Sequence, residues 1–194
     1  MNWQQGVKYA IEVSKGNINV GRSIRLACQR FINQYENQEW EWVFDEKYPQ
    51  HFLNFAIHLS HTKGPLAGQP LELEDWQIFL ICAIYGFRSK KDHSARMVTD
   101  VILYIPRKAG KSTLTSILAL YELACGEAGS EVFTLATNRE QASICFDSSK
   151  AIMESMVPEL QSRFIPYRSE LKKAGDSTST YRALSRENRK TGDG

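Results

Sequence analysis

The residues best suited to chemistry are Gly110, Lys111 and Ser112, which follow one another in the middle of the chain. They match the end of the phosphate-binding pattern G-x-x-x-x-G-K-[ST], in which the glycine lets the backbone approach phosphate oxygens closely. In such a loop the lysine contacts the β- and γ-phosphates of a nucleotide, and the serine hydroxyl ligates Mg²⁺. The tripeptide therefore predicts a nucleotide site in which Lys111 is catalytic and Ser112 holds Mg²⁺ through the nucleotide.

The loop departs from that pattern at its first position, where Ile105 replaces glycine. An isoleucine does not readily adopt left-handed backbone angles, and Pro106 fixes the next φ. Arg107 and Lys108 add two positive charges, which can bind phosphate or offset charge in the transition state, as an arginine finger does. We therefore predict that Arg107 is also catalytic. The predicted nucleotide-binding residues of the loop are Pro106, Arg107, Lys108, Ala109, Gly110, Lys111, Ser112 and Thr113.

A loop of this kind lies between a strand and a helix, and the flanking patterns predict both. Residues 98–105 contain a continuous apolar run that is typical of a buried parallel strand, and residues 112–126 have helical spacing. A second strand at 131–136 and a second helix at 139–156 follow. The order β-α-β-α favours an α/β fold with a parallel sheet. Farther along, only 181–184 has the composition of a short strand.

The chain before this core is predicted to be helical. Three sets of apolar residues recur at helical spacing within residues 1–64, and the turn-rich segment 64–68 then marks a boundary. A further amphipathic helix is expected at 74–87. We therefore predict a helical N-terminal region, 1–64, and a partial α/β core, 65–194, of which 163–194 is expected to be irregular or disordered.

The composition is that of an ordinary globular protein. Of the 194 residues, 42% are apolar and 24% are charged, and the net charge is only +2. No apolar run approaches the roughly 20 residues needed to span a bilayer. A locally basic segment near the C-terminus is either a solvated tail or a DNA-facing surface. Its basic residues are Arg163, Arg168, Lys172, Lys173, Arg182, Arg186, Arg189 and Lys190.

Four segments together resemble the ATPase domain of the large terminase subunits of tailed bacteriophages, the motors that package DNA into procapsids. They are Leu71–Gln77, Ile84–Phe87, Ile105–Ser112 and Leu135–Ala142, and the upstream segments Trp42–Glu46 and His61–Pro70 are also similar to that family. The resemblance extends over roughly residues 40–160. Its most specific parts are the P-R-K-x-G-K-S loop and the W-Q pair about 30 residues upstream.

The resemblance implies an α/β P-loop NTPase fold with a parallel sheet of the additional-strand type, incomplete in this chain, after an α-helical N-terminal region. It implies ATP and Mg²⁺ as ligands. Gln77 would read the adenine edge through its amide, and Trp76 would pack beside the base or, equally, into the protein core. Arg107 corresponds to the family's loop arginine, which acts on the nucleotide of its own subunit or of a neighbour.

The resemblance also implies partners. Residues 137–142 correspond to the segment that couples nucleotide state to DNA grip, and they suit a helix N-terminus capped by Thr137 or Asn138 as well. The expected partners are double-stranded viral DNA, the portal protein and the small terminase subunit. The intact motor is expected to be a homo-oligomeric ring in the host bacterial cytoplasm, transiently at the procapsid portal, without contact to a membrane.

A P-loop ATPase also needs an apolar strand ending in Asp-Glu, whose carboxylates orient Mg²⁺ and activate water. One such run exists, Trp42–Glu46, but it precedes the loop, and we interpret Asp45 and Glu46 as acids at a helix start. No such run follows the loop, and the family's nuclease carboxylates are absent too. We therefore expect ATP binding with poor hydrolysis, and an exposed sheet edge that favours self-association or lower stability.

Two classes of function remain open. The chain is either the first part of a packaging ATPase, or a catalytically inactive terminase-like module that binds the portal, the capsid or the intact motor. A helicase-like ATPase that shares the glutamine and the loop is a third alternative, which the P-R-K form of the loop disfavours. We expect the chain to be a fragment, the product of a split or decayed prophage gene, or a small protein that reuses this half.

Overall fold

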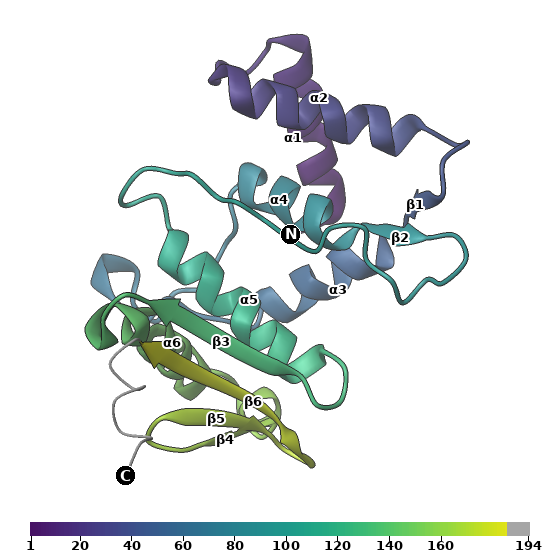
Figure 1. Cartoon of the computed structure of the whole chain (residues 1–194). Helices are drawn as coiled ribbons and strands as arrows, with labels where there is room; N and C mark the ends of the chain where they lie inside the picture. Colours follow the sequence, from purple (N-terminus) through teal and green to yellow (C-terminus); the bar gives the residue numbers. More distant parts are fainter. Residues whose placement is uncertain (186–194) are drawn as a thin grey trace. The chain divides into compact units, whose positions relative to one another are not determined.

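The structure, a computed structural model, describes residues 1–185, apart from the side chain of Arg139. The chain folds as two compact units (Figure 1). The first unit contains Met1–Ile57 and Glu72–Tyr104, and the second contains His58–Leu71 and the chain from Ile105 onward. The chain therefore passes between the units three times, and its last passage comes directly before the phosphate loop.

The first unit is built on helices. Its central helix is α4 (Asp75–Tyr85), which is largely apolar. No helix in the described part of the chain is long and apolar enough to cross a bilayer. Helix α1 (Trp3–Lys15) packs closely against α4 at Gly6. A Cβ added to Gly6 would come within 2.6 Å of the Phe79 backbone nitrogen, so only glycine fits there. The other elements of this unit are α2 (Arg22–Glu36), α3 (Lys47–Ala56) and the antiparallel short strands β1 (Trp42–Phe44) and β2 (Phe87–Ser89).

An aromatic cluster holds the short strands onto the helices of this unit. The Phe31 ring of α2 lies edge-on to Phe44 of β1 and to Phe87 of β2, with ring centroids 5.9 and 5.4 Å apart. Such edge-to-face pairs add to the stabilisation from apolar burial.

Asp45 and Glu46, which follow β1, lie at the start of α3 as predicted. Glu46 occupies the N-cap, and the Asp45 carboxylate accepts a hydrogen bond from the Lys47 backbone N–H at 3.0 Å.

The second unit is an α/β layer (Figure 1). Its four-stranded sheet has the order β3-β6-β5-β4, in which β3 and β6 are parallel and the other pairs antiparallel. The α/β fold class is confirmed, and so are the two predicted helices with a strand between them. The elements are η1 (Gly64–Leu66), α5 (Lys111–Cys125), β3 (Glu131–Ala136), α6 (Arg139–Glu154), α7 (Pro158–Gln161), β4 (Phe164–Pro166), β5 (Glu170–Lys173) and β6 (Asp176–Ser185).

Two expectations about this sheet are wrong. The sheet is mixed rather than parallel, because the turns after Pro166 and Lys173 are too short for a parallel crossover and join antiparallel neighbours. The segment from residue 163 onward, expected to be irregular, is regular as far as Ser185, and the predicted strand 181–184 is part of the ten-residue β6. The basic residues Arg186, Arg189 and Lys190 lie outside the described residues.

The predicted strand at 98–105 is also wrong. Residues 98–106 have no regular secondary structure, and Ile102 and Tyr104 are 98% and 100% exposed. A strand is stabilised by a neighbour that completes its hydrogen-bond ladder, and neither of the described sheets includes this segment. Its apolar residues suit a strand but have no partner strand among the described residues.

Candidate functional site

The phosphate loop alternates backbone handedness at its centre. Lys108 has a φ of 69° and Gly110 a φ of 72°, whereas Ala109 between them has a negative φ. In proteins, successive residues of alternating handedness are typical of backbone turns whose N–H groups bind an anion. Among the described non-glycine residues, Lys108 alone has a positive φ. Such a conformation costs about 1–3 kcal/mol and clusters at functional sites.

Helix α5 begins at the end of this loop, and no side chain caps it. Gly110 occupies the N-cap and has no side chain that could accept a hydrogen bond from the first N–H groups. These open donors and the positive end of the helix dipole favour an anion. The side chains of Arg107, Lys108, Lys111 and Ser112 are exposed. The loop can therefore offer a polyphosphate its backbone donors, three cations and one hydroxyl.

A buried serine anchors the first turn of α5 to α6. The Ser116 hydroxyl lies 2.8 Å from the Ser112 carbonyl oxygen and 3.1 Å from the Cys145 carbonyl oxygen of α6. Thr115 adds a second contact, since its hydroxyl donates to the Lys111 carbonyl at 3.0 Å. The carbonyl groups of Lys111 and Ser112 thus accept hydrogen bonds from the Thr115 and Ser116 side chains one turn later.

Hydroxyl hydrogen bonds also join α6 to the sheet. The Ser149 hydroxyl donates to the Cys145 carbonyl at 2.8 Å and reaches the Tyr181 hydroxyl of β6 at 3.3 Å, and Thr134 of β3 donates to that hydroxyl at 2.9 Å. Burial raises the pKa of Tyr181, so the phenol stays neutral at ordinary pH. We refer to Ser116, Ser149, Tyr181 and Thr134 as the hydroxyl network. Sequence reasoning missed it, although serines inside apolar helical patterns were a usable signal.

The segment after β3 forms the start of α6. Asn138 is the N-cap, and its side-chain oxygen accepts a hydrogen bond from the Gln141 backbone N–H at 2.8 Å. The Thr137 hydroxyl donates to the Gln141 side-chain oxygen at 3.2 Å. Of the two predicted capping residues, Asn138 is therefore the one that caps. The role of residues 137–142 in coupling nucleotide state to DNA grip stays a prediction.

The two residues predicted to contact adenine belong to the other unit. Gln77 lies in the first turn of α4, and its side-chain oxygen accepts a hydrogen bond from the Glu74 backbone N–H at 2.9 Å. Gln77 is 7% exposed, and Trp76 is half-buried. Gln77 therefore already stabilises the start of its helix, as the third residue of a capping box does. The adenine roles of Gln77 and Trp76 stay predictions.

The chain's own contribution to a metal site is small. Among the described residues, no group of three or more His, Cys, Asp or Glu side chains is placed to hold a metal ion. The Ser112 hydroxyl is exposed and neutral, and it stands beside cationic side chains in sequence. This donor set fits Mg²⁺ that arrives on phosphate oxygens and retains water ligands, because Mg²⁺ is seldom bound by an all-protein cage.

Much of the basic C-terminal segment is engaged in the fold rather than solvated. Lys172 pairs with Glu170 at 3.5 Å, and Arg182 pairs with Glu131 of β3 at 3.2 Å. The Lys173 ammonium donates to the Gly126 carbonyl at 3.1 Å. These charges support the mixed sheet. The expectation of a solvated, partly disordered tail is thus wrong for the described part of this segment, in which Arg163 and Arg168 are exposed.

Comparison with known proteins adds three findings. The family model described as terminase large subunit, ATPase domain, matches residues 75–194. Among solved structures, the crystal structure of the HK97 bacteriophage large terminase is similar, with a TM-score of 0.56 and 26% sequence identity. That match covers 71% of this chain and 27% of the HK97 protein, so the chain spans about a quarter of that terminase. A search of curated proteins finds no match.

Proposed function

The chain belongs to the family of terminase large subunits, whose ATPase domain it matches, and we propose that it is the N-terminal ATPase portion of a phage packaging motor. Such a motor uses ATP hydrolysis to move viral DNA into procapsids. The observation that carries the proposal is the phosphate loop, with left-handed angles at Lys108 and Gly110 before an uncapped α5. A basic loop with open backbone donors suits the triphosphate of ATP.

In this proposal the phosphates of ATP bind at the start of α5. The loop N–H groups and Lys111 would bind the β- and γ-phosphate oxygens, and Arg107 would offset the charge that develops during transfer, in its own subunit or a neighbour's. Mg²⁺, when bound, would neutralise part of the phosphate charge, and Ser112 would hold it. Gln77 and Trp76 would contact the adenine.

We further propose that this chain by itself binds ATP but hydrolyses it slowly. Activation of water needs a positioned acceptor for its proton, and no apolar run ending in Asp-Glu follows Thr113 in the sequence. The same observation supports a second candidate, a catalytically inactive terminase-like module that acts on the packaging machinery. The two candidates differ in whether the chain contributes turnover to an intact motor.

The proposed partners follow from family membership. They are double-stranded viral DNA, the portal protein and the small terminase subunit, with several copies of the large subunit in a ring. The proposed location is the host bacterial cytoplasm, transiently at the portal of the procapsid. We also propose that the intact motor translocates DNA and that the chain is of prophage origin.

Titration with a fluorescent ATP analogue in the presence of Mg²⁺ tests the nucleotide site. Lys111→Ala removes hydrogen bonds between charged groups worth about 1.5–3 kcal/mol, so its affinity should be about 10- to 150-fold weaker. Lys8→Ala, which removes an exposed lysine from α1, should bind like the wild type. Equal affinities for wild type and Lys111→Ala would overturn the assignment.

Phosphate release, with and without duplex DNA, tests the proposal of slow hydrolysis. Turnover should be far below about 1 s⁻¹, the low end of ordinary enzyme rates. Turnover above that value, lost in Lys111→Ala, would show that the chain holds a catalytic carboxylate outside the expected pattern. In that outcome the inactive-module candidate also fails, whereas the ATP site stands.

A further inference from the structure

Helix α2 presents a basic surface that the nucleotide site does not use. Between residues 13 and 35 the chain has four basic residues and no Asp or Glu. Arg22, Arg25 and Arg30 of α2 are all exposed, and none of them has an ion pair among the described residues. Of the 15 residues of α2, only Cys28 and Phe31 are buried. Most of the helix surface is thus open to a partner.

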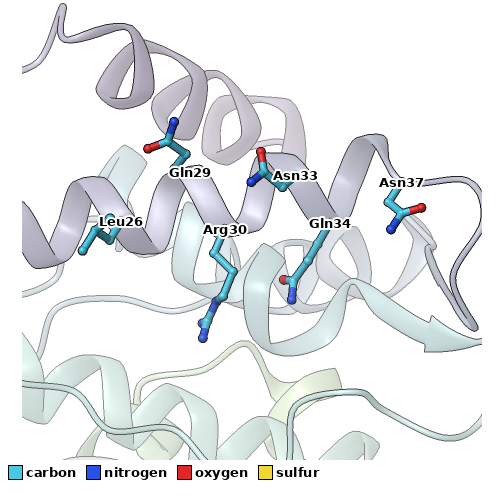
Figure 2. A pocket seen from close by; sticks show the side chains of 6 residues that line it. All are labelled: Leu26, Gln29, Arg30, Asn33, Gln34 and Asn37. Carbon is cyan, nitrogen blue, oxygen red and sulfur yellow. The ribbon is translucent and has the colours of Figure 1, made fainter.

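A hollow of about 430 Å³ lies on this surface (Figure 2). Figure 2 shows Arg30 and Gln34 extending to one side of the helix, and Gln29 and Asn33 to the other. Amide side chains both donate and accept hydrogen bonds, and no carboxylate takes part in the lining. The lining residues are Leu26, Gln29, Arg30, Asn33, Gln34 and Asn37.

Two of the arginines oppose the dipole of their own helix. Arg22 and Arg25 stand in the first turn, which has no acidic residue and no side-chain cap, and cations there oppose the helix dipole. Spacing of four residues aligns Arg22 with Leu26 and Arg30 along one row, and Arg25 with the amides in the next. The surface therefore carries two adjacent rows that combine fixed positive charge with neutral hydrogen-bonding groups.

We propose that this face of α2 binds the backbone of duplex DNA. The arginines would neutralise phosphates, and the amides of Gln29 and Asn33 would donate hydrogen bonds to phosphate oxygens, contacts that position a protein without reading sequence. A protein partner is less suited, because the centre of a protein interface is rich in aromatic residues, and no exposed residue of α2 is aromatic. The proposal deepens the proposed function by naming the surface that meets the DNA.

Duplex binding measured by fluorescence anisotropy over a series of salt concentrations tests this proposal. Each neutralised phosphate contributes about 0.9 to the slope of log K against log salt. Arg25→Gln with Arg30→Gln should therefore reduce the slope by about 1.8 and weaken binding about tenfold or more at low salt. Arg25→Lys with Arg30→Lys should restore the slope. Gln29→Ala with Asn33→Ala should weaken binding without changing the slope.

The matched control is Lys47→Gln with Lys91→Gln, which removes the same charge from exposed positions outside α2. It should leave the slope within error of the wild type. The proposal is overturned if wild type does not bind duplex, if the α2 variant keeps the wild-type slope, or if the control loses as much. Titration of the same samples with the ATP analogue separates the two proposals, because DNA binding can fail while nucleotide binding stands, and the reverse.

Discussion

At the scale of single residues, the phosphate loop depends on backbone angles as much as on charge. Gly110 has a φ of 72° at the N-cap of α5, where a side chain with a Cβ costs about 1–2 kcal/mol. The neighbouring Lys108 already tolerates a left-handed angle. A second strained residue in the same turn would open the loop, and the N–H groups would no longer converge.

Gly110→Ala should therefore weaken binding of the ATP analogue by about 5- to 30-fold, the equivalent of 1–2 kcal/mol. Gly16→Ala is the matched control, because Gly16 is also a left-handed glycine at a helix end, with nothing within 4 Å of an added Cβ. It should lower the melting temperature and leave nucleotide affinity unchanged. Similar affinity losses in both variants would show that general destabilisation, rather than the loop, is being measured.

At the scale of elements, a buried hydroxyl joins α5 to α6. Ser116 is fully buried, and its hydroxyl lies between the Ser112 and Cys145 carbonyl oxygens. Its removal breaks this bridge between the helices, but the Ser112 carbonyl keeps the Thr115 hydroxyl and the Cys145 carbonyl keeps the Ser149 hydroxyl. The expected cost is therefore that of one hydrogen bond, about 0.5–1.5 kcal/mol. Because one of these carbonyls belongs to the first turn of α5, the loss should be felt at the phosphate loop as well as in overall stability.

Ser116→Ala should lower the free energy of unfolding by about 0.5–1.5 kcal/mol, measured by urea denaturation, and should weaken nucleotide binding. Ser143→Ala removes a hydroxyl that bonds only within α6, to the Glu140 carbonyl at 3.0 Å, and should change neither quantity appreciably. If Ser116→Ala loses stability but binds nucleotide normally, the hydroxyl network stabilises the fold without positioning the loop.

Sequence patterns predicted the elements whose apolar spacing is local. Helix α5, strand β3 and helix α6 lie within two residues of the predicted bounds. Strand β6 was largely missed, because its first half is Asp-Ser-Thr-Ser-Thr, and its core contact comes from Tyr181. For residues 98–105 the composition predicted a strand, but composition does not specify a ladder partner.

In the candidate site, too, local patterns were predicted and contacts between distant residues were not. The identities of the loop residues follow from the motif, and Ile105 avoids left-handed angles as expected. The left-handed angle of Lys108 depends on the conformation of the whole turn. The residue types in the loop do not predict that conformation. The hydroxyl network joins residues far apart in the chain, such as Ser149 and Tyr181, and only the packing of α5, α6 and the sheet reveals it.

At the scale of the whole molecule, the sheet of the second unit has an edge strand whose outer side pairs with no other described strand. Strand β3 ends the four-stranded order, and Leu135 on it is 74% exposed. Edge strands with apolar side chains promote pairing between molecules, and lysine on an edge suppresses it. Leu135→Lys should therefore reduce self-association in sedimentation experiments without lowering the melting temperature.

Val157→Lys is the control for this change, since Val157 is an exposed apolar residue outside the sheet. It should self-associate like the wild type. An unchanged association constant in Leu135→Lys would show that β3 does not mediate the contact.

The fully exposed Tyr104 also marks an expected site of proteolytic cleavage. It lies in a stretch without regular structure, so a chymotrypsin-like enzyme should cut there early, between the two units. The cut would not separate the halves cleanly, because His58–Leu71 precedes it in the chain yet belongs to the second unit. Nicked protein should therefore migrate as one species in native gels and as two fragments after denaturation, and bound nucleotide next to the scissile bond should slow the nick.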